Sequence, residues 1–222
     1  MGQAVRRIDF RANVAPTFSL IAMDPVEQRF ECVVQQILEQ GRALIEGLFP
    51  DQILTDLRHR LADLREEDAL RPAAIGAAGQ AEVHTEIRSD YIRWWPDAPD
   101  HPAEQAYLER VRALSDYLNR TCFTGIRRFE CLYAAYPPGA RYERHVDDFQ
   151  NKNARKFSVV TYLNPDWEPA NGGELVLYDA AGEPTERIAP LFGRTLIFSS
   201  PDVEHEVLPA LAERWSVTGW MR

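Results

Sequence analysis

The stretch 156–163 reads KFSVVTYL, a short β-prone run that decides the fold because a series of such runs fills the C-terminal half of the chain. Turn sequences such as NGG at 171–173 separate one run from the next. The expected strands are 129–136, 141–146, 156–163, 174–178, 194–199, 204–209 and 214–221. Short strands at this spacing predict a β-sandwich or β-barrel rather than a parallel sheet.

The N-terminal half shows helical periodicity instead. One expected helix, which Gly41 ends, carries an apolar stripe made of Phe30, Val33, Val34, Ile37 and Leu38. Asp51 is the expected N-cap of a second helix. The second helix is expected at 53–64 and a third at 103–120, and β-prone segments are expected at 43–49 and 81–95. Helices followed by strands indicate the α+β class.

Composition narrows the class of protein. The chain has 222 residues, with 25 Lys and Arg against 34 Asp and Glu, which gives a net charge of −9. Such an acidic chain argues against nucleic acid as a partner, and no apolar run approaches the ~20 residues of a membrane span. The first residues lack the apolar stretch of a secretory signal, and Cys32, Cys122 and Cys131 are expected to be buried thiols. We therefore expect a cytoplasmic protein that binds neither nucleic acid nor membrane.

Residues 142–149 read YERHVDDF and hold the first candidate metal ligands. His145 and Asp147 are two residues apart in an expected strand, so both side chains would lie on one face. His205, in a later expected strand, completes a set of two histidines and one carboxylate. This is the facial triad of non-haem iron(II) oxygenases, which leaves three coordination positions open. The spacing therefore predicts an iron site.

Arg214 follows nine residues after His205 on the expected adjacent strand, where its guanidinium would meet a carboxylate at the far end of a short diacid. Each of these four residues, taken singly, is more commonly structural. Their combination favours the metal site. His59, His84 and His101 show no partner pattern, and we do not expect them to be ligands.

Several motifs in the same order give a resemblance to a known family. They are YPPGARYERHVDD, VTYLNPDW, GGELVLY, HEVLPA, RWSVTGW and, further upstream, IRSDYIRWW at 87–95. The stretch 133–222 resembles the 2-oxoglutarate- and Fe(II)-dependent prolyl hydroxylases, and it is most similar to the hypoxia-inducible-factor prolyl hydroxylases and their bacterial relatives. Arg214, where collagen-type enzymes carry Lys, favours that subgroup.

The resemblance implies a double-stranded β-helix, or jelly roll, with N-terminal helices packed on one sheet. It implies a single oxygenase domain over 1–222. Within it, 1–20 would form a loose arm, 21–125 the helical support and a substrate hairpin, and 126–222 the jelly-roll core. The hairpin would be mobile and cover the substrate, with the Ala- and Gly-rich 72–79 as its hinge. The alternative is that 81–96 is an ordinary paired strand on the outer sheet.

The resemblance also implies roles for individual residues. His145, Asp147 and His205 would bind Fe(II), and Arg214 and Tyr162 would hold the distal carboxylate of 2-oxoglutarate. The rest of the cosubstrate pocket would be lined by Tyr136, Leu175 and Thr218. The substrate would meet Arg155, Trp220, Arg88, Asp90 and Trp94. The chain departs from the family at Asp148, where Asn is common, and the spacing from His145 to Tyr162 is one residue longer than in the animal enzymes.

The implied reaction is hydroxylation of a prolyl residue in a protein, with O2 and 2-oxoglutarate as cosubstrates, ascorbate as reductant, and succinate and CO2 as products. Bacterial relatives suggest a translation factor such as elongation factor Tu as the target. One alternative is the same chemistry on a small molecule, another side chain or a nucleobase, which the residues around metal and cosubstrate do not distinguish. A second alternative is a metal-bound sensor or binding module without turnover, against which the intact triad and Arg214 argue.

Overall fold

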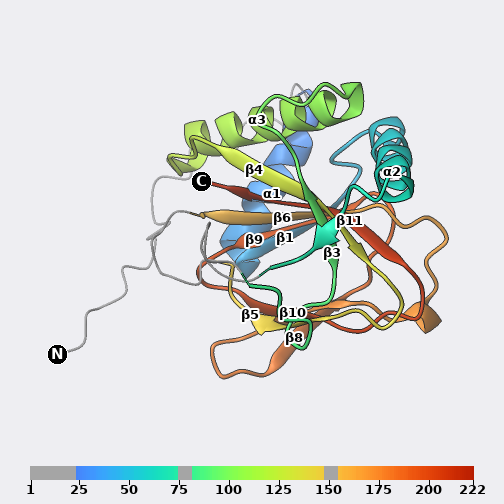
Figure 1. The fold of residues 1–222 in the computed structure, drawn as a ribbon. Helices are drawn as coiled ribbons and strands as arrows, with labels where there is room; N and C mark the ends of the chain where they lie inside the picture. The colour runs from blue at the N-terminus through green and yellow to red at the C-terminus, as the bar shows by residue number, and fades with distance from the viewer. Residues whose placement is uncertain (1–23, 75–81, 148–154) are drawn as a thin grey trace.

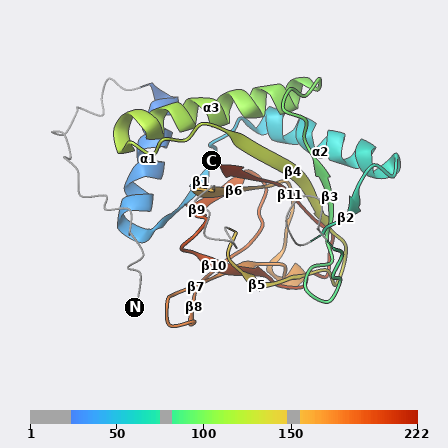
Figure 2. The ribbon, with the colours of Figure 1, turned by 60° about the vertical axis from the view of Figure 1, so that its left-hand side comes forward.

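The computed structural model describes residues 24–74, 82–147 and 155–222. Two antiparallel sheets face each other in this part of the chain, and three helices cover the outer face of the larger sheet (Figure 1 and Figure 2). The helices are α1 (Pro25–Gln40), α2 (Asp51–Glu66) and α3 (Pro102–Cys122). This arrangement confirms the α+β class and the jelly-roll core with helices packed on one sheet.

The larger sheet has the strand order β1-β9-β6-β11-β4-β3-β2, and the smaller sheet has the order β5-β10-β7-β8. The strands of the larger sheet are β1 (Arg42–Glu46), β2 (Arg71–Pro72), β3 (Tyr91–Trp94), β4 (Phe129–Tyr136), β6 (Phe157–Tyr162), β9 (Arg194–Ser199) and β11 (Arg214–Met221). Those of the smaller sheet are β5 (Tyr142–His145), β7 (Leu175–Tyr178), β8 (Pro184–Ile188) and β10 (Glu204–Val207). A short 3-10 turn, Pro169–Asn171, precedes β7.

The ends of α1 follow from local chemistry. The Asp24 carboxylate accepts a hydrogen bond from the Val26 amide at 2.7 Å, and Gly41 ends the helix with a left-handed φ of 73°. Four of the five expected apolar positions are buried, but Leu38 is 46% exposed and the prediction that it belongs to the core was wrong. The apolar face of α1 is narrower than the sequence pattern indicated.

The start of α2 also differs from the prediction. Pro50, not Asp51, is the N-cap residue, and it makes no side-chain capping bond. Asp51 is instead the first helical residue, where its negative charge still suits the positive end of the helix dipole. The predicted core stripe of this helix is confirmed, because Leu54, Leu57 and Leu61 are fully buried.

Alternation along β11 creates two separate cores. Trp215, Val217 and Met221 pack with the helices on the outer face of the larger sheet. Arg214 and Trp220 point the other way, into the space between the two sheets. The fold therefore places helical support on one side of the larger sheet and a partly polar interior on the other.

Every predicted C-terminal strand is present, and among the described C-terminal residues one strand, β8, was missed. β8 has the sequence PTERI, and its mostly exposed polar residues give no β-pattern. The expectation that Arg214 lies on the strand beside His205 was wrong, because β10 belongs to the smaller sheet and β11 to the larger one. Arg214 therefore approaches the site from the facing sheet.

The segment expected as a substrate hairpin is only partly a strand. Tyr91–Trp94 forms β3, which pairs with both β2 and β4 inside the larger sheet. Ahead of it, Arg88 makes an isolated bridge with Tyr142, and the Glu143 amide donates to the Ile87 carbonyl. Most of the expected hinge, the arm 1–20 and Asp148 lie outside the described residues. The described part of the hairpin is thus hydrogen-bonded to the body of the protein.

The cysteines differ from the expectation of three buried thiols. Cys131 is buried, but Cys122 is partly exposed and Cys32 is exposed. Across the described ranges, no helix is both long and apolar enough to span a membrane.

Candidate active site

His145, Asp147 and His205 come together at one end of the smaller sheet. β5 and β10 are antiparallel neighbours, and His145 lies directly opposite His205 in the register. The Nε2 atoms of His145 and His205 lie 3.6 and 3.8 Å from the two carboxylate oxygens of Asp147. The candidate ligand atoms of all three residues lie within 4.8 Å of one another. The arrangement fits one metal ion.

The position of Asp147 departs from the expectation of a shared strand. β5 ends at His145, so Asp147 lies just beyond the strand, yet its carboxylate still converges with the two imidazoles. The end of the strand leaves Asp147 without ladder hydrogen bonds of its own, since the pairing with β10 stops at His145. Its orientation therefore depends on contacts outside the smaller sheet.

Backbone carbonyls fix the tautomers of both histidines. Nδ1 of His145 is 2.7 Å from the Glu143 carbonyl oxygen, and Nδ1 of His205 is 3.2 Å from that of Val203. A carbonyl only accepts, so each Nδ1 carries the proton and each Nε2 presents its lone pair. This is the orientation in which metal-binding histidines are held.

Burial sets the charges at this cluster. Desolvation lowers the pKa of His205 to about 4, so this imidazole is neutral at pH 7. Burial alone would raise the pKa of Asp147, but the neighbouring His205 and His145 and a hydrogen bond from Ser158 hold it well below its ordinary value. A neutral imidazole beside an ionised carboxylate is the protonation state that binds a divalent metal.

Arg214 and Tyr162 form a second group between the sheets. Arg214 is 1% exposed, and its Nε donates to the Gly173 carbonyl at 2.9 Å. Its guanidinium lies 4.9 Å from the ring of Tyr136 and 5.0 Å from that of Tyr162. Among the described residues, neither Nη2 of Arg214 nor the buried Tyr162 hydroxyl has a hydrogen-bond partner.

Two buried donors without an acceptor are costly in a folded protein. Burial raises the pKa of Tyr162, so its hydroxyl stays protonated and able to donate. An anionic acceptor between Arg214 and Tyr162 would satisfy both donors at once. This pair is therefore suited to hold a carboxylate.

Gly173 is a contributor that the sequence reasoning missed, because NGG was explained as a turn. A Cβ at Gly173 would come within 2.8 Å of the Ala210 Cβ and 3.3 Å of the Arg214 Cδ, and its φ of 71° is strained for other residues. The Trp167 indole holds the same turn by donating to the Gly172 carbonyl at 3.1 Å. The turn thus makes room for the Arg214 side chain, and its Gly173 carbonyl accepts a hydrogen bond from Nε of Arg214.

The other residues expected around the cosubstrate lie close to this pair. Tyr136 lies directly opposite Arg214 in the β4–β11 register, and Leu175 packs in the same apolar cluster as Tyr162. Thr218 lies on the same face of β11 as Arg214. The described residues therefore bring all of the expected cosubstrate set to the inner faces of the two sheets.

Three of the expected substrate residues form a shelf beside the triad. The rings of Trp94 and Trp220 lie 5.7 Å apart, and the Arg155 guanidinium lies 3.8 Å from the Trp220 ring. Arg155 also donates to Glu130 at 2.9 and 3.0 Å and to the Asp147 carbonyl at 3.3 Å. Trp94 is 47% exposed, so this tryptophan–arginine shelf reaches the protein surface at Trp94.

The remaining two expected substrate residues, Arg88 and Asp90, form an ion pair with each other. Arg88 makes two hydrogen bonds of 2.8 and 2.7 Å to the Asp90 carboxylate, and Asp90 is 1% exposed. The Arg88 guanidinium lies 4.3 Å from the Tyr142 ring, which stacks on His145 at 3.6 Å. The Arg88–Asp90 pair thus braces the wall behind His145, and Asp90 is too buried to offer its carboxylate to a substrate.

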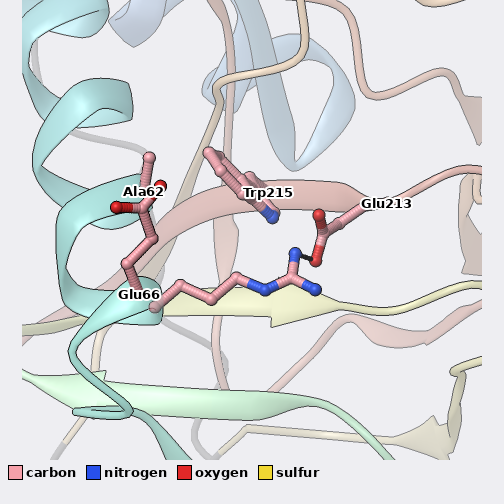
Figure 3. Close-up of a pocket in the computed structure, with 5 residues that line it drawn as sticks. Ala62, Glu66, Glu213 and Trp215 are labelled. Carbon is pink, nitrogen blue, oxygen red and sulfur yellow. Dashed lines mark ion pairs between the residues drawn. The ribbon is translucent and has the colours of Figure 1, made fainter.

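A hollow of about 340 Å³ lies elsewhere, between α2 and β11 (Figure 3). Its lining is Ala62, Arg65, Glu66, Glu213 and Trp215. Trp215 faces the helices while its neighbour Arg214 faces the interior, so the hollow is on the opposite side of the sheet from the triad. A second hollow is lined by residues that include His59 and His101.

Comparisons with known proteins agree with this geometry. Residues 131–222 match the family model of the 2OG-Fe(II) oxygenase superfamily. A crystal structure of a Pseudomonas putida prolyl-4-hydroxylase superposes with a TM-score of 0.79 at 36% identity, covering 87% of this chain and 98% of that one. A Trichoplax adhaerens prolyl hydroxylase in complex with a hypoxia-inducible-factor peptide fragment gives a TM-score of 0.77 at 29% identity, covering 88% and 90%.

Among curated proteins, Egl nine homolog 1 of Mus musculus is 38% identical over 150 residues, which is 64% of this chain and 36% of that protein. The chain thus spans about a third of the length of this relative. Fold and site together define a 2-oxoglutarate- and Fe(II)-dependent oxygenase. Within that class, the chain belongs to the prolyl 4-hydroxylase family.

The residues present fit the metal and cosubstrate of this family. Two imidazoles and a carboxylate are a donor set that Fe(II) accepts. The unpartnered donors of Arg214 and Tyr162 fit a carboxylate of 2-oxoglutarate. Fe(II) and 2-oxoglutarate therefore suit two groups of side chains that come from the two facing sheets.

The depressed pKa of His205 predicts a pH dependence of stability. Between pH ~6.5 and ~4 the unfolded chain binds a proton at His205 that the folded chain does not, so metal-free protein should lose up to about 3 kcal/mol as pH falls through this window. Urea unfolding with a chelator at pH 7 and pH 4.5 measures the loss. His205→Asn should reduce the loss of unfolding free energy between pH 7 and pH 4.5, while His59→Asn at an exposed position should leave it unchanged. The same loss in the parent and both variants would contradict the assignment of this pH dependence to His205.

The donor pair predicts a graded effect on 2-oxoglutarate binding. Arg214→Lys keeps the charge but loses the planar fork, and should weaken binding by about 10–100-fold. Tyr162→Phe removes one neutral donor and should weaken it by about 2–10-fold. Calorimetry with Mn(II) present gives the affinities, and Tyr178→Phe, whose hydroxyl bonds to Glu206, is the matched control. Unchanged affinity in Arg214→Lys would place the carboxylate elsewhere.

Proposed function

We propose that the protein is an Fe(II)- and 2-oxoglutarate-dependent dioxygenase that hydroxylates a prolyl residue in a protein and releases succinate and CO2. The observation that carries this proposal is the convergence, from two facing sheets, of a His–Asp–His cluster and a buried pair of unpartnered donors. Neither group alone defines the reaction. Together they match what a metal and a dicarboxylate cosubstrate require.

His145, Asp147 and His205 would hold the metal, and Fe(II), when bound, supplies the redox centre that reacts with O2. The protein's share is to present the ligands in a fixed geometry. The carbonyls of Glu143 and Val203 keep both Nδ1 protons in place, so each Nε2 needs no reorientation to bind. Three protein ligands leave positions for both cosubstrates.

Arg214 and Tyr162 would bind the distal carboxylate of 2-oxoglutarate. The guanidinium neutralises the charge of this carboxylate, and the protonated Tyr162 hydroxyl donates a further hydrogen bond. Tyr136, Leu175 and Thr218 would line the rest of the pocket. Because Tyr136, Tyr162 and Leu175 are at most 5% exposed, they exclude water from the cosubstrate.

The tryptophan–arginine shelf would receive the substrate. A proline ring packs well on an aromatic face, and Trp94 offers such a face at the surface. The Trp220 indole N–H has no partner among the described residues and would donate to a peptide carbonyl. Arg155 and Arg88 would contact the substrate beside Trp220. The Trichoplax adhaerens relative is in complex with a peptide fragment, which supports a peptide as the substrate.

The target itself is a finer proposal. Resemblance to bacterial relatives favours a translation factor such as elongation factor Tu, which would place the reaction in the cytoplasm. Ascorbate would serve as the reductant. The experiment is designed to exclude two alternatives. One is a small molecule or another side chain as the substrate, and the other is a metal-bound module without turnover.

The test separates cosubstrate turnover from peptide hydroxylation. With Fe(II), 2-oxoglutarate and ascorbate, the protein should form succinate and add one oxygen to a proline of elongation factor Tu or of another protein in a bacterial lysate, as mapped by mass spectrometry. Trp94→Ala should lower peptide hydroxylation by up to about tenfold while slow succinate formation without peptide continues. His205→Ala should lose both activities.

Tyr91→Ala is the matched control for the shelf. Tyr91 is similarly exposed on the same strand, but odd and even positions of β3 point to opposite faces. This variant should hydroxylate peptide at the parental rate. Oxygen gained only by non-prolyl residues or small molecules would overturn the prolyl assignment, and absence of succinate in the parent would overturn the enzymatic one.

A further inference from the structure

Two buried serines lie behind the carboxylate of Asp147. The Ser158 Oγ is 2.5 Å from Oδ2 of Asp147, and the Ser200 Oγ is 2.8 Å from the Ser158 Oγ. Both serines are 0% exposed. Ser158 lies in β6 of the larger sheet and Ser200 directly follows β9 of that sheet, whereas the histidines belong to the smaller sheet.

The direction of these hydrogen bonds follows from the donor at Ser158. Its hydroxyl donates to Oδ2 of Asp147, since a metal-binding carboxylate oxygen only accepts. Because the Ser158 hydroxyl donates to Oδ2, its oxygen accepts a hydrogen bond from the Ser200 hydroxyl. The chain runs from Ser200 through Ser158 to Asp147, and each hydroxyl strengthens the next as a donor.

The backbone holds this chain in place. The Ser200 amide donates to the Lys156 carbonyl at 3.1 Å, next to the register in which Ser199 pairs with Phe157. Asp147 itself has no such support from β5, because the ladder with β10 ends at His145. The hydroxyl of Ser158 is therefore the side-chain anchor that ties this carboxylate to the larger sheet.

We infer that Ser158 is a positioning residue for the metal site, with Ser200 as its support, an inference that rests on the proposed function. Ser158 holds Oδ2 in the orientation in which the carboxylate faces both imidazoles. Hydrogen-bond partners of metal ligands typically change metal affinity by about 10–100-fold when they are removed. The sequence reasoning gave no role to either serine.

Co(II) is the probe for this inference, because its visible absorption reports ligand geometry as well as occupancy. Titration of Ser158→Ala should show Co(II) affinity weakened by about 10–100-fold and a changed spectrum at saturation. Ser200→Ala should weaken affinity less, since Ser158 can still donate to Asp147. Ser115→Ala is the control: this serine is also buried, but its hydroxyl bonds to the Val111 carbonyl on α3.

Two further proteins distinguish the failure of this inference from that of the proposed function. Parental protein should bind Co(II) and His205→Ala should not; equal binding by these two would overturn the proposed metal site and the inference with it. Tight parental binding that is lost in His205→Ala but unchanged in Ser158→Ala, with the same spectrum, would overturn the inference alone. Thermal unfolding of each metal-free variant accompanies the titrations, and a lower midpoint in Ser158→Ala with unchanged Co(II) affinity would also overturn it.

Discussion

The register of β5 against β10 is the constraint on which the rest of the site depends. Antiparallel pairing places His145 directly opposite His205, so two ligands arrive side by side from one ladder. Because side chains alternate along a strand, a slip of one residue would turn either histidine to the other face of the sheet. Tyr142 on β5 packs against His145, and the Arg88–Asp90 pair packs behind Tyr142. Much of the surrounding wall therefore serves this one alignment.

The facing sheet supplies the rest of the site, and it does so with buried polar groups that are unpaired or held by single contacts. Arg214 keeps a charged guanidinium in the interior, where its Nε donates to the Gly173 carbonyl and its Nη2 has no partner among the described residues. Tyr162 adds a hydroxyl without a partner in the described part of the chain. Such groups destabilise the folded state until an acceptor arrives. A dicarboxylate that accepts hydrogen bonds from these groups would remove this local loss of stability, which would contribute to its affinity.

The features that could be predicted from the sequence are those with a recognisable spacing of residue types. Strands and helices with regular apolar spacing were predicted, as were the triad and Arg214, because metal ligands are rare residue types in a recognisable order. β8 was missed because its residues are polar and exposed. That Asp147 lies beyond its strand and Arg214 on the facing sheet depends on tertiary pairing, which periodicity does not encode. Ser158 within an apolar run and the carbonyl of Gly173 gave no signal, since neither residue type indicates a site.

The central claim is that two sheets deliver two different binding groups to one cosubstrate. A crystal structure of the protein with Mn(II), a non-oxidising substitute for Fe(II), and 2-oxoglutarate tests this most directly. It should show Mn(II) bound by His145, Asp147 and His205, and one carboxylate of 2-oxoglutarate in contact with both Arg214 and Tyr162. A metal held by other residues, or a 2-oxoglutarate whose carboxylates leave the Arg214–Tyr162 pair unpaired, would contradict the claim.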